Sequence, residues 1–393
     1  MTIPWQGTLE PVKHLGRLCI LSAGLLLSLW SIPSSAMELA RGEMFGEPYD
    51  LRGYAWLEED IRLASHTADG TSAESSDLRR ARLGLGVRWQ RDWIFHLAGN
   101  FAHRTSLRDL WIEYRGWPVR LEVGRFLEPF GLGESINASD RLLTSLPSPA
   151  ALGPDYGFGI GFNYRGSTWG LAGGAFTRHA GPSLSGRFAE DAFTARGTWR
   201  PLVGEDGYLH LGVSGSFRRT QAGSGVQLFG TSESSLVRGM SPQSVLEMLG
   251  DRYRLTGEET LMRLGPITLL GEMIQAKVAD GGPTWHGEYA ELGWCVTGER
   301  RSYSTRYGTI GGISPNRPVE LDGFGAWEVA LRWSKTDLSD DGGDHGYVRS
   351  VALSWYPTDP VRISLSLHRA HLEPLGGSPR DTTLGQLQVQ LRL

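Results

Sequence analysis

Apolar residues alternate with polar ones or glycine along several stretches of this sequence, most clearly in RRARLGLGVRW, residues 79–89. Successive side chains of a β-strand point to opposite faces, so this stretch predicts a strand with two unlike faces. One face carries Ala81, Leu83, Leu85, Val87 and Trp89. The other carries Arg80, Arg82, Gly84, Gly86 and Arg88. Such a strand needs an apolar environment on one side and water on the other.

The same alternation recurs along most of the chain, in about sixteen runs of roughly nine to twelve residues, the length that a tilted strand needs to cross a membrane. The runs start near residues 51, 78, 93, 107, 118, 156, 168, 190, 206, 252, 266, 286, 323, 346, 360 and 382. No segment after residue 36 has the ~18 consecutive apolar residues of a transmembrane helix. We therefore predict an all-β protein, a transmembrane antiparallel β-barrel of about sixteen strands.

The connections between these runs differ greatly in length. Several are short, such as QRD after Trp89, RGS after Tyr164 and PTDP after Tyr356. Three are long and cover residues 127–155, 219–251 and 300–322. Outer-membrane barrels have short turns at one end and longer loops at the other, so we expect the three long connections to share one end.

A soluble β-sandwich also alternates, with one face toward its core and one toward water, and is the main structural alternative. Two features favour the membrane. Aromatic residues gather at the ends of runs, where an interfacial girdle would lie. The opposite faces are also rich in Gly, Ser and Thr, which is unusual for solvated sandwich strands.

The first 36 residues have the pattern of a signal peptide. Lys13 and Arg17 precede the apolar run LCILSAGLLLSLWSI, and Ala36 ends a short segment of small residues that suits cleavage. We expect residues 37–393 to form the barrel as one domain. Cleavage would remove Cys19 and leave Cys295 alone, which excludes a disulfide-stapled fold.

Arginine supplies nearly all of the positive charge, because the chain has only three lysines, Lys13, Lys277 and Lys335. An arginine at the lipid face near the bilayer midplane costs about 2–4 kcal/mol, so strand arginines are expected to face the lumen. The arginines that alternate with the apolar face of their strand, and are therefore expected to face the lumen, are Arg80, Arg82, Arg88, Arg196, Arg200, Arg218, Arg332 and Arg362. Arg79 falls on the opposite face, so it can reach water only at the mouth of the strand or beyond a β-bulge, and of these two we expect the rim of the barrel.

These arginines have two alternative roles. Their permanent charge and planar donors suit carboxylate or phosphate oxygens of a passing anion. They could equally pair with acids of the same faces and brace the wall. The acids that also read as inward are Asp109, Glu113, Glu122, Glu272, Glu291, Glu299 and Glu328.

Several segments resemble the phosphate-selective porin O and P family. LRRARLGLGVRWQRDWIFHLAGNF is similar to its double-arginine strand and the strand that follows, and LEVGRFLEPFGLGE is similar to its Gly-[Gln/Arg]-Phe…Pro-Phe segment. AELGWCVTGERRSY, GAWEVALRWSKTDLSD and ALSWYPTDPVRISLSLHRAHL resemble later strands in the same order. The likeness extends over residues 50–393.

This resemblance implies a sixteen-stranded trimeric porin whose arginines draw anions toward a phosphate site, with residues 127–155 folded into the pore as a constriction loop. Arg79 and Arg80 match the family's double arginine, and Asp109 matches an acid of its next strands. The family also uses lysines after the Pro-Phe motif. Here the loop has none, and its charged residues are Glu134, Asp140 and Arg141.

We therefore expect a passive outer-membrane channel for small anions, phosphate or polyphosphate among them. Two alternatives remain: a general or weakly cation-selective porin, and a barrel that sheaths a partner protein. Expected partners are small anionic solutes, outer-membrane lipid and lipopolysaccharide, and two further copies of the chain in a homotrimer. The near-neutral balance of 39 Lys and Arg against 43 Asp and Glu gives no reason to expect nucleic acid.

Enzymatic and metal-binding motifs are weak in this sequence. In HRAH, His368 and His371 lie three residues apart and would point to opposite faces of a strand. No nucleophile elbow, dinucleotide fingerprint or phosphate-binding loop stands in a suitable context. We predict no catalytic residue, no metal and no cofactor.

Overall fold

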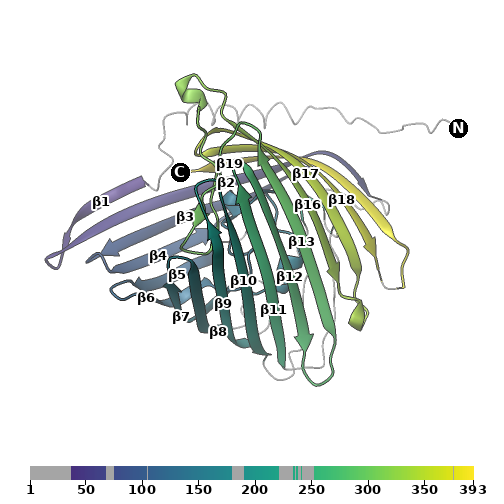
Figure 1. Ribbon diagram of the computed structural model, residues 1–393, viewed down its shortest axis with the longest axis horizontal. Helices are drawn as coiled ribbons and strands as arrows, with labels where there is room; N and C mark the ends of the chain where they lie inside the picture. The colour runs from purple at the N-terminus through teal and green to yellow at the C-terminus, as the bar shows by residue number, and fades with distance from the viewer. Residues whose placement is uncertain are drawn as a thin grey trace.

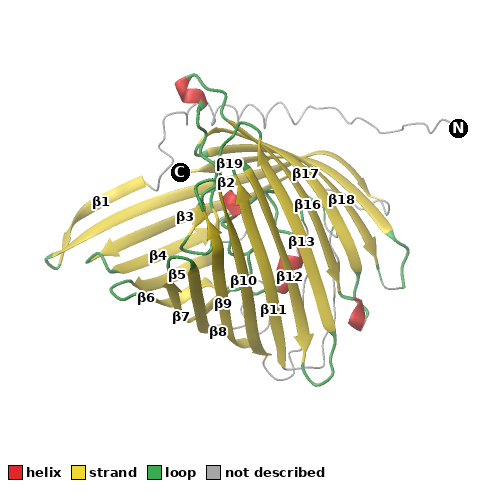
Figure 2. Ribbon diagram, viewed as in Figure 1, coloured by secondary structure: helices red, strands yellow, loops and turns green. Residues whose placement is uncertain are grey.

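The computed structural model describes residues 37–67, 75–103, 105–178, 190–220, 233–234, 236–237, 240, 252–374 and 376–393. The predicted signal peptide, residues 1–36, lies outside the described residues. Within them, sixteen antiparallel strands form a closed barrel (Figures 1 and 2). Each strand pairs with its neighbours in the chain, and the pairing of β19 with β2 closes the ring. No helix of the described part is long and apolar enough to cross a membrane.

The predicted barrel of sixteen strands is confirmed, and each wall strand starts within four residues of its expected position. The wall strands are β2 (Glu47–Thr67), β3 (Ser76–Trp89), β4 (Trp93–Asn100), β5 (Ser106–Tyr114), β6 (Val119–Leu127), β7 (Tyr156–Arg165), β8 (Trp169–Arg178), β9 (Glu190–Val203), β10 (Gly207–Thr220), β11 (Arg252–Leu264), β12 (Ile267–Val278), β13 (Thr284–Cys295), β16 (Ala326–Asp337), β17 (His345–Thr358), β18 (Val361–Glu373) and β19 (Arg380–Arg392).

The barrel has two unlike ends. Connections of two to four residues, such as 90–92 and 265–266, lie at one end, which we call the short-turn end. Residues 128–155 and 221–251 connect strands at the opposite, long-loop end. The prediction that the third long connection shares this end is wrong. Because β13 finishes at the short-turn end and β16 starts there, residues 296–325 belong to that end, as the positions of η3 (Val319–Leu321) and η4 (Ser339–Asp341) show in Figure 1.

One strand of the main sheet lies outside the closed ring. β1 (Met37–Met44) pairs with the first residues of β2, whereas β19 pairs with β2 from Trp56 onward. The turn between them contains Phe45 and Gly46, which both have positive φ. β1 therefore extends the wall past the end of β19, and the β1–β2 hairpin projects from the barrel in Figure 1.

Burial alternates along the wall strands, but here the inward side chains are the buried ones. On β11, for example, Leu255 and Glu259 are buried, whereas Arg254 and Glu258 are exposed on the outer face. Chain segments that enter the lumen cover the inward faces. They are the constriction loop (128–155), with η1 (Ala138–Asp140) and η2 (Ser148–Leu152), the inserted turn (296–325), with β14 (Tyr303–Ser304) and β15 (Thr309–Ile310), and part of 221–251.

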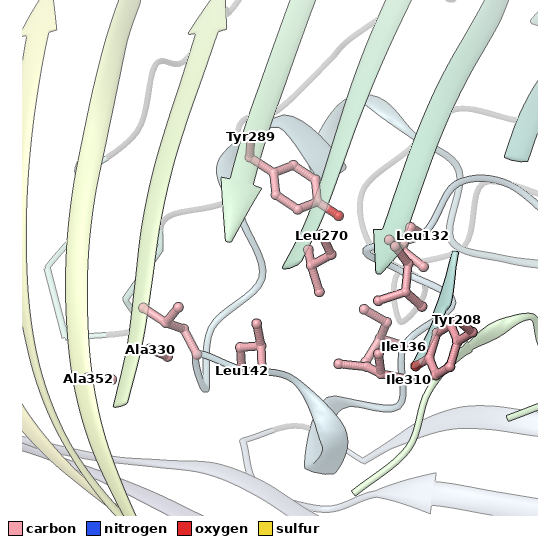
Figure 3. Packing of buried hydrophobic residues seen from close by; sticks show 11 residues of the cluster. Leu132, Ile136, Leu142, Tyr208, Leu270, Tyr289, Ile310, Ala330 and Ala352 are labelled. Atoms are coloured by element: carbon pink, nitrogen blue, oxygen red, sulfur yellow. The ribbon is translucent and has the colours of Figure 1, made fainter. Parts of the chain in front are cut away.

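Apolar packing fixes the constriction loop inside the barrel (Figure 3). Leu132, Ile136 and Leu142 of the loop are buried against wall side chains that include Leu270 and Tyr289. The inserted turn contributes Ile310 to the same cluster, from the short-turn end. The prediction of a pore-constricting loop is confirmed, and the inserted turn meets that loop from the other side.

Candidate anion pathway

Polar contacts from the wall hold the constriction loop at its first turn. Glu272 of β12 accepts hydrogen bonds from the backbone N–H groups of Leu132 (2.9 Å) and Gly133 (3.0 Å), and from the hydroxyl of Tyr289 (2.9 Å). Gly131, with φ of +64°, lies so close to Glu272 that a Cβ there would overlap its carboxylate. Glu272, predicted to face inward, therefore anchors the loop.

Two of the predicted pathway arginines also hold segments inside the lumen. Arg362 donates to the backbone oxygens of Arg141 (2.7 Å) and Leu142 (2.6 Å) of the constriction loop. Arg332 forms ion pairs with Glu291 (2.7 Å) and with Glu233 of the 221–251 connection (3.3 Å). It also donates to the backbone oxygen of Ser145 at 2.8 Å. These contacts join wall, loop and connection.

Arg196 and Arg218 are braced by carboxylates. Arg218 donates to both oxygens of Glu128 at 2.8 and 3.1 Å. Arg196 pairs with Glu259 and also donates to the backbone oxygens of Tyr307 (2.5 Å) and Gly308 (3.1 Å) of the inserted turn. Both arginines are buried, and both join parts of the chain that are far apart in sequence.

The double arginine pairs with acids of β2. Arg80 forms an ion pair with Glu58, and Arg79 lies 3.5 Å from both Glu58 and Asp60. The expectation that Arg79 lies at the rim is wrong. The β2–β3 register shifts at this point, so Arg79 is the extra residue of a β-bulge and reaches the same acids as Arg80.

Three arginines gather near the constriction loop, and we call them the upper cluster: Arg82, Arg108 and Arg141. The Arg82 guanidinium lies 4.7 Å from the ring of Trp56, and its buried Nε has no hydrogen-bond partner in the described structure. Arg108 lies 4.5 Å from the ring of Tyr156 and within electrostatic range of Arg82.

Arg141 completes the upper cluster from within the constriction loop. It lies 3.5 Å from Glu134, and its buried Nε also has no partner in the described structure. Burial lowers the pKa of the Arg141 guanidinium, more than the neighbouring carboxylate of Glu134 raises it. Asp140 has a different role, because it lies 3.3 Å from Arg392 and its backbone oxygen accepts from Arg301 at 2.6 Å.

A second group of cations surrounds a cavity of about 100 Å³ between β6–β9 and the inserted turn, which we call the lower chamber. Its cationic lining includes Arg165, Arg200 and Arg306. Arg200 lies 4.5 Å from the ring of Tyr303, and Arg306 pairs with Glu113 at 2.9 Å. Burial opposes the charge on Arg306, but Tyr307 and Glu113 together raise its pKa.

Within the described residues, five of the nine predicted arginines pair with carboxylates: Arg79, Arg80, Arg196, Arg218 and Arg332. Arg82, Arg88, Arg200 and Arg362 have no carboxylate there within ion-pair distance, and Arg88 is exposed at the short-turn end.

Sequence reasoning missed three residues. Extending the alternation of β7 by one residue would have predicted that Arg165 faces the lumen. A second β-bulge reverses the face expected for Arg108, and Arg306 lies in the inserted turn, which has no alternating pattern.

Comparison with known proteins settles the family. The model of the phosphate-selective porin O and P family matches residues 50–391. The chain belongs to this family. Porin O of Pseudomonas aeruginosa is 23% identical over 368 residues, which cover 80% of this porin and 81% of that protein. An uncharacterized protein of Caulobacter vibrioides is 25% identical over 354 residues, 81% of this porin and 68% of that protein.

Solved structures share the fold. The anion-selective porin from Comamonas acidovorans has a TM-score of 0.55 at 10% identity, over 88% of this porin and all of that chain. The outer-membrane channel DcaP of Acinetobacter baumannii has a TM-score of 0.52 at 12% identity, over 90% of this porin and all of that chain. This protein is therefore an outer-membrane porin, and its short-turn end faces the periplasm.

Family and fold point to a channel rather than an enzyme. The two histidines of HRAH point to opposite sides of β18. His368 is buried and lies 2.8 Å from Ser350, whereas His371 lies 2.8 Å from Asp381 on the outer face. Across the described ranges, no group of three or more His, Cys, Asp or Glu side chains is arranged to hold a metal ion.

Proposed function

We propose that this porin is a passive channel biased toward small anions, phosphate and polyphosphate among them. The observation that carries the proposal is Arg82, a buried lumen arginine with an unused donor and no carboxylate partner among the described residues. A guanidinium of this kind attracts an anion that can complete its hydrogen bonds. Arg108 and Arg141 lie near enough to add to the same positive potential.

The proposed path has two positions for an anion. From outside the cell, the anion first meets the upper cluster beside the constriction loop. It then reaches the lower chamber, where Arg165 and Arg200 have no carboxylate within ion-pair distance among the described residues. Conduction requires binding that is favourable but brief, and two successive sites satisfy this requirement. The description of the family and the anion selectivity of a porin with a similar fold also support a preference for anions.

The alternatives are less well supported by the lumen. Glu272, Glu291 and Glu328, which could favour cations, are each engaged by a donor or an arginine, and Glu122 in the lining of the lower chamber lies within electrostatic range of Arg306. A barrel that sheaths a partner protein requires a wide lumen, whereas the constriction loop here packs against several wall strands and the inserted turn. Both features favour passage of a small anion.

Single-channel recording in a planar bilayer under a KCl gradient tests the proposal, with phosphate then titrated in. We expect a reversal potential that favours chloride, and current block by phosphate. Arg82→Gln should weaken the block at least about tenfold, because a hydrogen bond to a charged group contributes about 1.5–3 kcal/mol. The control Arg254→Gln removes an exposed arginine of the outer face and should leave both quantities unchanged.

A cation-favouring reversal potential without block would contradict the proposal and leave a general porin. Equal phosphate block in Arg82→Gln and Arg254→Gln would retain anion selectivity but remove Arg82 from the site.

We further propose that three copies associate through the outer face of β1–β4. A groove of about 700 Å³ there is lined almost entirely by apolar side chains, including Leu39, Leu83, Leu85 and Leu97. Native mass spectrometry in mild detergent should give a trimer mass, and Leu85→Arg should give the monomer mass.

A further inference from the structure

The outer face of β16–β18 changes character along the membrane normal. Near the short-turn end, the stacked rings of Trp327 and Trp355 lie 5.8 Å apart. Toward the long loops, the outward side chains are first apolar and then include arginine. On neighbouring strands, Arg349 of β17 and Arg369 of β18 occupy directly opposed register positions. This change marks the upper edge of the apolar belt.

The two opposed arginines are exposed and face outward. Within the described part of the chain, neither has a carboxylate within ion-pair distance. Asp381 lies within electrostatic range of Arg369, but it is hydrogen-bonded to His371 at 2.8 Å. The Arg349 guanidinium lies 4.8 Å from the ring of Tyr347. Like charges directly opposite each other destabilise a sheet. An anion bound between the two guanidinium groups would remove this repulsion.

An apolar groove of about 590 Å³ adjoins the two arginines on the same outer face. Leu331, Trp333, Val351 and Leu367 line it, together with the stems of Arg349 and Arg369. A ligand that fits here therefore has an acidic head at the edge of the apolar belt and a hydrocarbon chain below it. The groove lies outside the lumen, so it is independent of the proposed anion pathway.

We propose that Arg349, Arg369 and this groove bind lipopolysaccharide, with a lipid A phosphate between the guanidinium groups and an acyl chain in the groove. The long-loop end faces the cell exterior, so the site lies in the outer leaflet. Paired guanidiniums suit phosphate oxygens, and burial of hydrocarbon along the groove adds affinity. Lys335, exposed on β16 and opposite Tyr347 in register, supplies a third nearby cation.

Charge complementarity favours this ligand over a protein. A second protein would have to present carboxylates within the edge of the apolar belt, where they are costly. Lipid A brings its phosphates to that level together with its acyl chains. The same surface would bind a phospholipid less well, because a phospholipid has no second phosphate for Lys335, the third cation beside the arginine pair.

The test is native mass spectrometry of the detergent-solubilised porin with added bisphosphorylated lipid A. The variant Arg349→Gln/Arg369→Gln should lose at least tenfold in apparent affinity. A matched control is Arg254→Gln/Lys277→Gln, which also removes two opposed outward cations, but nearer the loops and away from the groove. The control should bind as the unmodified porin does. Phosphatidylglycerol should compete poorly.

Unchanged heat-dependent mobility in SDS and unchanged single-channel conductance establish that the variant is folded. Equal lipid A affinity in the variant and its control would overturn the proposal. Equal competition by phosphatidylglycerol would overturn the assignment to lipid A. A change of oligomeric mass in the variant with lipid A binding intact would identify the surface as a protein interface and would also overturn it.

Discussion

At the scale of the residue, the lumen arginines divide into those that pair with carboxylates and brace the wall and those that have no carboxylate partner among the described residues. Strand parity predicts which arginines face inward, since alternation alone determines the face. It does not predict which are neutralised, because the partners come from distant segments: Glu233 for Arg332, and Glu128 for Arg218. Arg82 keeps an unused donor although it lies only two residues from Arg80, which has a partner on β2.

Arg332→Gln tests the bracing role. The substitution leaves Glu291 and Glu233 buried without their cation, which costs about 3–5 kcal/mol for a buried pair. We expect the variant to convert to the heat-modified form in SDS at a distinctly lower temperature. Arg254→Gln removes an exposed cation from the outer face of β11 and should not change that temperature. Equal transitions in the two variants would show that Arg332 does not brace the wall.

At the scale of the element, the strands were predictable from their periodicity, the constriction loop was expected only from the family resemblance, and the position of the inserted turn inside the barrel was not expected. A strand of a membrane barrel repeats every two residues, so its start can be located from the sequence. The inserted turn has no such period, and only the order of strands reveals its end of the barrel. The anchors of the constriction loop are equally hidden, because Glu272 contacts backbone groups about 140 residues away.

Glu272→Ala tests the anchoring of the constriction loop. The variant loses the acceptor for two loop N–H groups and for the hydroxyl of Tyr289. We expect the loop to shift within the lumen, which should raise single-channel conductance and add open-channel noise. Glu258→Ala removes an exposed carboxylate from the outer face of β11 and serves as the control. Recordings that match in the two variants would mean that apolar packing alone holds the loop.

Surface labelling tests the end to which the inserted turn belongs. Leu321, 76% exposed in η3, should lie on the periplasmic side, and Asp340 in the connection after β16 on the outside. In intact cells, a maleimide attached to a polymer of about 5 kDa, which is too large to pass the lumen, should label Asp340→Cys but not Leu321→Cys. Permeabilised cells should show labelling of both. Labelling of Leu321→Cys in intact cells would reverse the assignment.

At the scale of the whole molecule, composition and alternating pattern determine the barrel, whereas the segments packed inside the barrel determine the path left for a solute. The alternating runs and the resemblance predict sixteen strands and a loop in the pore, and both are present. What the sequence does not predict is the combined packing of the constriction loop, the inserted turn and part of 221–251 in one lumen. That packing depends on contacts between segments that share no local pattern.

The filled lumen leads to a prediction about salt. Charges in water at the mouths, such as Arg88, are screened as the Debye length falls from about 10 Å at ~0.1 M to about 3 Å at ~1 M salt. Buried cations such as Arg82 are screened much less. If the upper cluster and lower chamber carry selectivity, the chloride-to-potassium permeability ratio should persist across this range. Reversal potentials under matched gradients measure it, and a ratio that falls to one at high salt would place selectivity at the mouths.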